Sequence, residues 1–151
     1  MDRRDLLQSA AALSIAAMAG PAAAAGKPEE HMKMKMDHHH GSPYGALAHA
    51  ATHCVMLGEA CIGHCLELLG QGDKAMAECA KSVEQMMAAC NALRQLATWN
   101  SAYVPRMARV VMDMCKDCEQ ACRKHEQMHQ SCRDCAEACA DCTRACAVVA
   151  A

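Results

Sequence analysis

The chain has 151 residues, of which 13 are cysteine and 13 are methionine, and it contains no phenylalanine, one tryptophan and two tyrosines. Its formal net charge is -2, from 15 Lys+Arg against 17 Asp+Glu, and no basic cluster follows the N-terminus, which argues against nucleic-acid binding. Leucine, isoleucine and valine are scarce after residue 25, so an ordinary aliphatic core would be thin for a domain of this size.

Residues 1–25 resemble a signal peptide of the twin-arginine type. The pair Arg3-Arg4 precedes an apolar run over residues 6–19, which ends at Gly20 and is followed by small residues suited to cleavage. This run is too short to cross a bilayer as a helix, and no later segment is long and apolar enough. The sequence therefore predicts export to the periplasm and a mature protein without a membrane span.

Residues 26–43 are predicted to be a flexible tail, because proline, glycine and charged residues leave them no core of their own. Thioethers suit Cu(I), and imidazoles suit Cu(II), zinc or nickel, so the tail is a candidate for metal capture. A solvated tail without that role has the same composition. The candidate side chains are His31, Met32, Met34, Met36, His38, His39 and His40.

Residues 44–151 are expected to form one all-α domain. Gly70 and Gly72 mark a clear break, after which Asp73 suits the N-cap of a second helix. The stretch 99–101 marks the next break, with a serine that suits an N-cap. Two long helices therefore precede the second half of the domain.

The third break is the least marked, since it contains neither glycine nor proline. Ser131 followed three residues later by Asp134 resembles a capping box at the start of the last helix. Four long helices joined by short turns predict an antiparallel up-down-up-down four-helix bundle. The expected helices cover 44–70, 73–99, 102–125 and 128–150.

The cysteines follow the helical period. Most neighbouring cysteines within a predicted helix are three, four or seven residues apart, so their side chains share one face of that helix. In the second helix, Met86 lies on the same face as the cysteines. All thirteen thiols are therefore predicted to line the core: Cys54, Cys61, Cys65, Cys79, Cys90, Cys115, Cys118, Cys122, Cys132, Cys135, Cys139, Cys142 and Cys146.

Four kinds of core could contain so many thiols. Cysteine as a small buried hydrophobe explains one or two of them. Disulfides suit an exported chain, but the count is odd and adjacent turns of one helix meet disulfide geometry poorly, which leaves pairs between helices. Zinc and iron–sulfur sites usually place one Cys-x-x-Cys on a tight turn, whereas these pairs are helix-compatible. Cu(I) accepts two or three thiolates and can share them, so a tube of thiols can hold roughly one ion per cysteine.

The Cys-x-x-Cys-x-x-x-Cys pattern occurs at 115–122 and at 132–139, and the second copy continues to Cys146. Together with the exported leader and the four helices, it resembles the bacterial copper storage proteins over about residues 44–150. The resemblance implies a homotetramer whose bundles load Cu(I) through the thirteen cysteines. It also implies supply of copper to enzymes such as particulate methane monooxygenase and protection against copper toxicity.

No enzyme is expected, because no nucleophile is paired with an oriented base. A copper chaperone that delivers the metal is a further candidate partner. The alternative function is that of an exported helical scaffold stapled by disulfides, or of a thiol redox protein.

The antiparallel topology predicts different chemistry at the two ends of the bundle. Imidazole and thioether bind Cu(I) more weakly than thiolate, so they could pass copper in and out, although histidine also suits helix caps and methionine also suits packing. One end is expected to be an apolar plug made of Leu47, Leu93, Ala97, Val104, Met107, Val111 and Val148. The other is expected to be a gate made of His64, Met76, His125, Met128 and His129.

Overall fold

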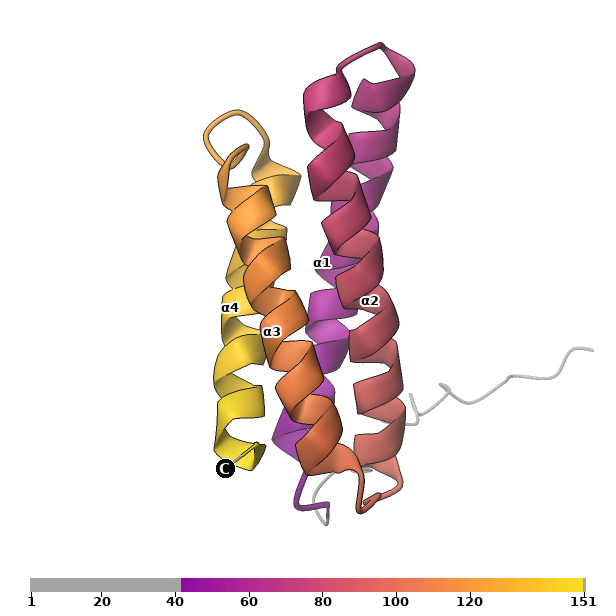
Figure 1. Ribbon diagram of the computed structural model, residues 1–151, viewed down its shortest axis with the longest axis vertical. Coiled ribbons are helices and arrows are strands. Elements are labelled where there is room, and N and C mark those ends of the chain that lie inside the picture. The colour runs from indigo at the N-terminus through magenta and orange to yellow at the C-terminus, as the bar shows by residue number, and fades with distance from the viewer. Residues whose placement is uncertain (1–41, 151) are drawn as a thin grey trace, which may run out of the picture. The chain divides into compact units, whose positions relative to one another are not determined.

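The computed structural model describes residues 42–150, and within that range it is an antiparallel up-down-up-down four-helix bundle, as predicted (Figure 1). The predicted signal peptide and most of the predicted tail, residues 1–41, lie outside the described residues. The helices are α1 (Gly45–Gly70), α2 (Ala77–Thr98), α3 (Val104–Arg123) and α4 (Gln130–Val149), and a short 3₁₀ turn, η1 (Lys74–Met76), leads into α2.

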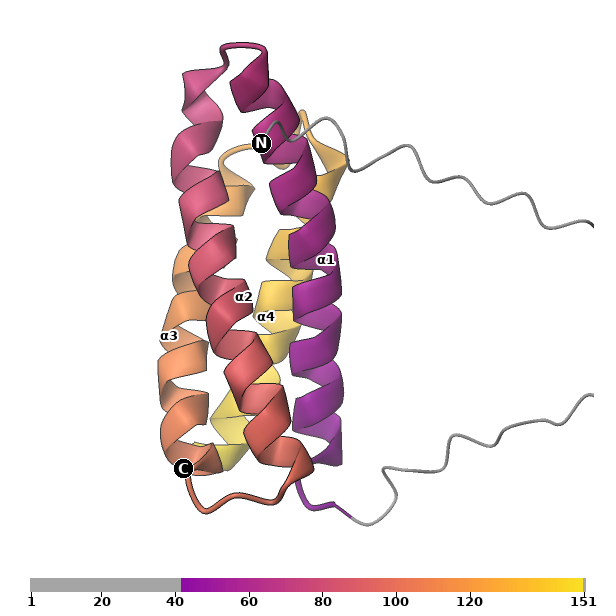
Figure 2. The ribbon, with the colours of Figure 1, turned by 90° about the vertical axis from the view of Figure 1, so that its right-hand side faces the viewer.

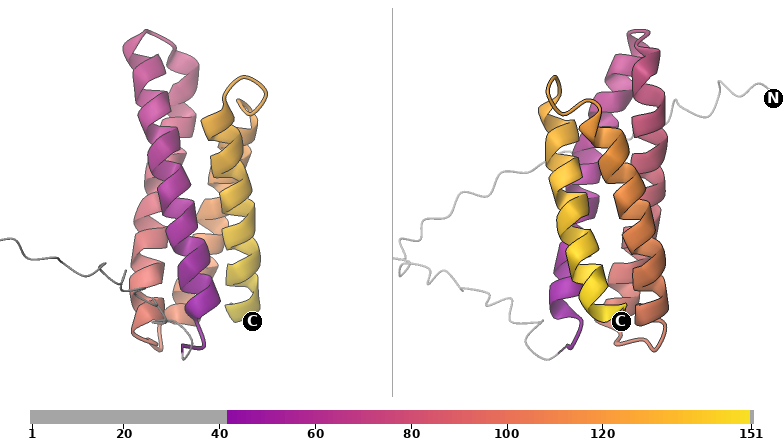
Figure 3. Two further views of the ribbon diagram at one scale, coloured as in Figure 1. Left: turned by 180° about the vertical axis from the view of Figure 1, so that it is seen from behind. Right: turned by 60° about the vertical axis from the view of Figure 1, so that its left-hand side comes forward.

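The helices form two hairpins that pack against each other, α1 with α2 and α3 with α4. Helix α1 also contacts α4, and α2 contacts α3, so the four helices enclose a single core (Figures 2 and 3). The connections 71–73 and 124–129 lie at one end of the bundle, called here the gate end, and the α1–α2 hairpin extends past the α3–α4 turn there. The connection 99–103 lies at the opposite end, called the plug end.

The connection between α1 and α2 contains the predicted glycine turn and the predicted aspartate N-cap. Gly72 has a φ of 94°, which glycine adopts without the steric cost that a side chain would impose. The side chain of Asp73 accepts a hydrogen bond from the backbone N–H of Ala75 at 3.0 Å. Asp73 is therefore an N-cap, as expected, although the first turn that it caps is 3₁₀.

The predicted capping box at the start of α4 is wrong. Helix α4 begins at Gln130 after His129, whose own side chain makes no capping bond. The chain has thus entered the helix before Ser131, whose buried hydroxyl has no hydrogen-bond partner among the described residues. Asp134 instead accepts a hydrogen bond from Gln130 Nε2 at 2.6 Å.

Cysteine dominates the core. All thirteen cysteine side chains have 0% of their surface exposed, as predicted, and the described residues include no buried charged side chain. Small alanines on all four helices fill much of the remaining core, which lets the helices approach closely. None of the described helices combines the length and apolar character that a membrane crossing needs.

The plug end is apolar, with one correction. Leu47, Leu93, Ala97, Val104 and Val111 are buried as predicted, and Met107 is partly buried. Val148, however, is 81% exposed. On α4, Val149 packs against the core instead. Residues three apart lie on the same face of a helix, so Val149 continues the inward stripe from Cys146, whereas Val148, two residues on, points away from it.

Two glycines inside α1 are predicted to respond differently to alanine. Gly63 has open space around the position of a Cβ, so Gly63→Ala should stabilise the copper-free protein by about 0.5–1 kcal/mol through helix propensity. A Cβ at Gly58 would lie 2.8 Å from Met87 Cγ and 3.0 Å from Met86 Cε, so Gly58→Ala should lose that gain to crowding. Urea unfolding of the reduced protein measures both, and an equal gain at the two positions would contradict the packing described at Gly58.

Candidate metal centre

The thiols of the four helices meet along the bundle axis at distances that suit a shared metal. Neighbouring sulfurs from different helices are 3.5 Å apart for Cys79–Cys122, 3.7 Å for Cys54–Cys139, 3.8 Å for Cys90–Cys115 and 3.9 Å for Cys61–Cys132. A disulfide bond is about 2.05 Å long, and all thirteen cysteines are free in the structure. Two sulfurs that each lie about 2.3 Å from one tetrahedral ion are about 3.8 Å apart.

Twelve of the thirteen sulfurs, all but that of Cys146, fall into four groups, within each of which all sulfur atoms lie within 4.8 Å of one another. The groups are Cys54, Cys90, Cys115 and Cys142; Cys61, Cys65, Cys79 and Cys132; Cys61, Cys122 and Cys135; and Cys118, Cys135 and Cys139.

These groups form one continuous column. Cys61 and Cys135 each belong to two groups, and the Cys54–Cys139 contact joins the remaining group to the rest. Cys146 lies next in the stripe of α4, one turn beyond Cys142. The structure therefore brings twelve of the thirteen predicted cysteines together in linked groups, and Cys146 extends their array toward the plug end.

Protons are shared unevenly along the column. Burial raises the pKa of the Cys65 thiol, and negative charge on Cys61 and Cys79 would raise it further. A hydrogen bond with Cys122 lowers the pKa of Cys61 to about 4. Thiols whose pKa is raised hold their protons at neutral pH, so a metal ion that binds them as thiolates must displace those protons.

The gate end brings the three predicted histidines together. His64 Nε2 on α1 lies 2.9 Å from His129 Nδ1 at the start of α4, within hydrogen-bond distance. The ring of His125 lies 6.5 Å from that of His129 between centroids. Met76 is fully buried at this end, whereas Met128 is 73% exposed, the most exposed of the five predicted gate residues.

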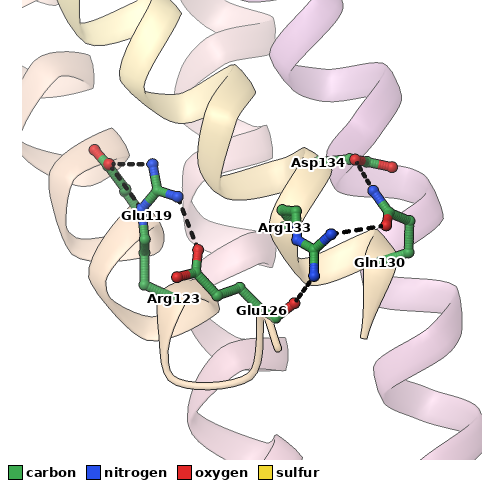
Figure 4. Close-up of polar contacts among 6 residues, drawn as sticks. All are labelled: Glu119, Arg123, Glu126, Gln130, Arg133 and Asp134. Atoms are coloured by element: carbon green, nitrogen blue, oxygen red, sulfur yellow. Dashed lines mark hydrogen bonds and ion pairs between the residues drawn. The ribbon is translucent and has the colours of Figure 1, made fainter. Parts of the chain in front are cut away.

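The loop that carries His125 and His129 is held from both adjoining helices (Figure 4). Arg123 at the end of α3 donates to the carboxylate of Glu126 at 2.8 Å. Arg133 on α4 donates to the backbone carbonyl of the same residue, also at 2.8 Å. Each such contact at the surface contributes little stability, about 0–1 kcal/mol, but together they fix the position of the loop. These contacts are not predicted by the sequence, since nothing in the spacing of the two arginines marks a bond to a loop residue.

The chain matches proteins that store copper. A family model described as copper storage protein matches residues 40–151. Among solved structures, the chain is similar to the copper storage protein Ccsp from Streptomyces lividans loaded with 10 copper equivalents, with 21% sequence identity and a TM-score of 0.65. That match covers 82% of this chain and 92% of the other, and at this identity it shows the fold. No curated protein sequence matches the chain significantly.

Proposed function

The chain belongs to the copper storage protein family, and from that premise we propose that it stores many Cu(I) ions as thiolate complexes inside its bundle. The continuous column of buried thiols carries this proposal. Cu(I) is soft and selects thiolate ligands, and it accepts two or three of them. Thirteen cysteines that share ions along the column would hold roughly one Cu(I) each. The role is storage, and no catalytic role is proposed.

Zinc is the competing metal, because two of the sulfur groups contain four cysteines, the number that a structural zinc site uses. Separate tetrahedral sites without shared ligands would give thirteen cysteines room for about three zinc ions. The groups overlap instead, at Cys61 and at Cys135. A metal that needs few ligands and tolerates bridging thiolates uses such an array more fully, which favours Cu(I).

We propose that copper enters and leaves through the gate end, past His64, Met76, His125, Met128 and His129. The His64–His129 contact lies beside Cys65, the cysteine of α1 nearest to that end. The plug end offers an incoming ion mainly aliphatic side chains. Donors weaker than thiolate can pass an ion inward without retaining it.

We further propose that the protein works in the periplasm as a homotetramer, where it supplies copper enzymes and limits copper toxicity. The twin-arginine pattern in residues 1–25 supports export. The homotetramer and the supply of copper to enzymes are proposed because the resemblance to the family implies them.

Anaerobic titration with Cu(I) tests the storage proposal. The reduced chain should first show thirteen free thiols and then bind roughly one Cu(I) per cysteine, measured by metal analysis of the desalted protein. Because thiols with a raised pKa lose protons on binding, loading should acidify a weakly buffered solution and should weaken as the pH falls.

Zinc titration of the same preparation is the control. Saturation near three ions with zinc displacing copper would favour zinc sites. About one free thiol after purification without reductant, together with little copper uptake, would favour the disulfide-stapled scaffold.

The gate is tested by the double variant His64→Ala/His129→Ala. Loading and chelator-driven release should become several-fold slower while capacity stays the same, because the thiol column is untouched. Stopped-flow absorbance of the copper–thiolate band follows both rates. The matched control is His49→Ala/His53→Ala, which removes two exposed histidines from α1. Equal rates in wild type and gate variant would refute the gate.

Export is tested by fractionating cells that express the full chain. The mature protein in the periplasm should begin near residue 26, as read by intact-mass spectrometry. Replacement of Arg3 and Arg4 by lysine should leave a longer chain in the cytoplasm, because both arginines define the export pattern. A full-length chain that stays in the cytoplasm of wild-type cells would contradict export.

A further inference from the structure

We propose that Met86 is a Cu(I) ligand, a neutral thioether donor that joins the thiol column at Cys54. The inference rests on the proposed storage of Cu(I) and adds a site to it. Met86 lies in the middle of α2, well away from the gate residues. Its spacing from Cys79 and Cys90 predicts an inward position on the helix but indicates no chemical role.

The sulfur of Met86 touches the column directly. Met86 Sδ lies 3.3 Å from Cys54 Sγ, a shorter distance than any of those between cysteine sulfurs given above, and the Met86 side chain has no exposed surface. Cys54 Sγ also lies 3.7 Å from Cys139 Sγ. Cys54 is thus flanked by a thioether from α2 and a thiol from α4, and an ion bound at Cys54 has both within reach.

Met86 also occupies a gap in the thiol lining. Helix α2 contributes only Cys79 and Cys90 to the column, and the inward positions between them are held by Val83 and Met86. Valine has no donor atom. Met86 lies four residues before Cys90 and seven after Cys79, which puts its sulfur on the same helix face as both thiols. Met86 is the fully buried thioether that α2 offers between its two cysteines.

Gly58 on α1 makes room for this arrangement. A Cβ at Gly58 would lie 3.0 Å from the Met86 methyl carbon and 2.8 Å from Met87 Cγ, so any larger residue would displace these side chains. Gly58 follows Cys54 by one helical turn and therefore shares its face of α1. Glycine is unfavourable inside a helix, and here it leaves the space in which the Met86 methyl packs while the sulfur faces Cys54. Gly58 is accordingly a positioning residue for Met86.

A thioether suits a Cu(I) site that is buried in the core of the bundle. It is a soft donor that suits Cu(I), and it carries neither a charge nor a proton. Cu(I) bound by two thiolates and Met86 would carry one negative charge less than Cu(I) bound by three thiolates. Because uncompensated charge is costly in a buried site, the neutral donor completes three-coordination at lower cost.

Silver(I) in place of Cu(I) gives a direct test, since it is a soft monovalent ion whose silver-109 nucleus couples to ligand protons. The full chain, labelled with carbon-13 at its methionine methyl groups, is loaded with silver-109 and examined by proton–silver correlation NMR. The Met86 methyl should give a correlation that is lost in Met86→Leu and kept in Met87→Leu. Contacts from the methyl to the Cys54 β protons, which lie near the Met86 sulfur, assign the signal in the wild-type chain, so the test does not depend on a variant that folds.

The outcomes separate the two proposals. Uptake of silver and Cu(I) by the thiols with no correlation at Met86 would overturn the Met86 site and leave storage intact. Failure of the wild-type chain to take up either ion would overturn both. Gly58→Ala should weaken or abolish the Met86 correlation, whereas Gly63→Ala, which adds a methyl in open space, should keep it. An unchanged correlation in Gly58→Ala would remove the positioning role of Gly58.

Discussion

Close contact between sulfur atoms in a dry core is the interaction on which this bundle depends. Thiols from all four helices lie 3.5–4.0 Å from one another along the axis, and every one of them is fully buried. No buried charged side chain among the described residues is available to neutralise thiolates. Burial therefore keeps thiols such as Cys65 protonated in the empty protein, and Cu(I) bound to the thiolates would supply the compensating positive charge. Bound copper would thus neutralise charge that the protein's own side chains leave uncompensated.

The two ends of the bundle differ because the helices alternate in direction. The plug end is closed by aliphatic residues such as Leu93 and Val104, which offer no donor to a metal. The gate end carries the His64–His129 contact and a loop that Arg123 and Arg133 hold through Glu126. A single column with a closed end and a polar end suits filling and emptying from one side.

The proposed donors form a graded series. Partly buried imidazoles lie at the gate end, thiols fill the column, and the thioether of Met86 lies beside Cys54 deeper in the bundle. Thiolates bind Cu(I) most tightly of the three, so retention is assigned to the cysteines and exchange to the histidines. The thioether adds a ligand without adding charge.

The sequence by itself determined the helices and the inward position of all thirteen cysteines, because both follow from the 3.6-residue period and from turn residues such as Gly72 and Asp73. Local patterns failed where the exact turn mattered: Ser131 lies inside α4, and Val149 packs in the core where Val148 was expected. Only the tertiary structure decided which sulfurs meet, including Cys79 with Cys122 and Cys54 with Met86. These pairs depend on the axial shift and the separation of neighbouring helices, which are set by side-chain packing such as that at Gly58. The period of a single helix contains no information about either quantity.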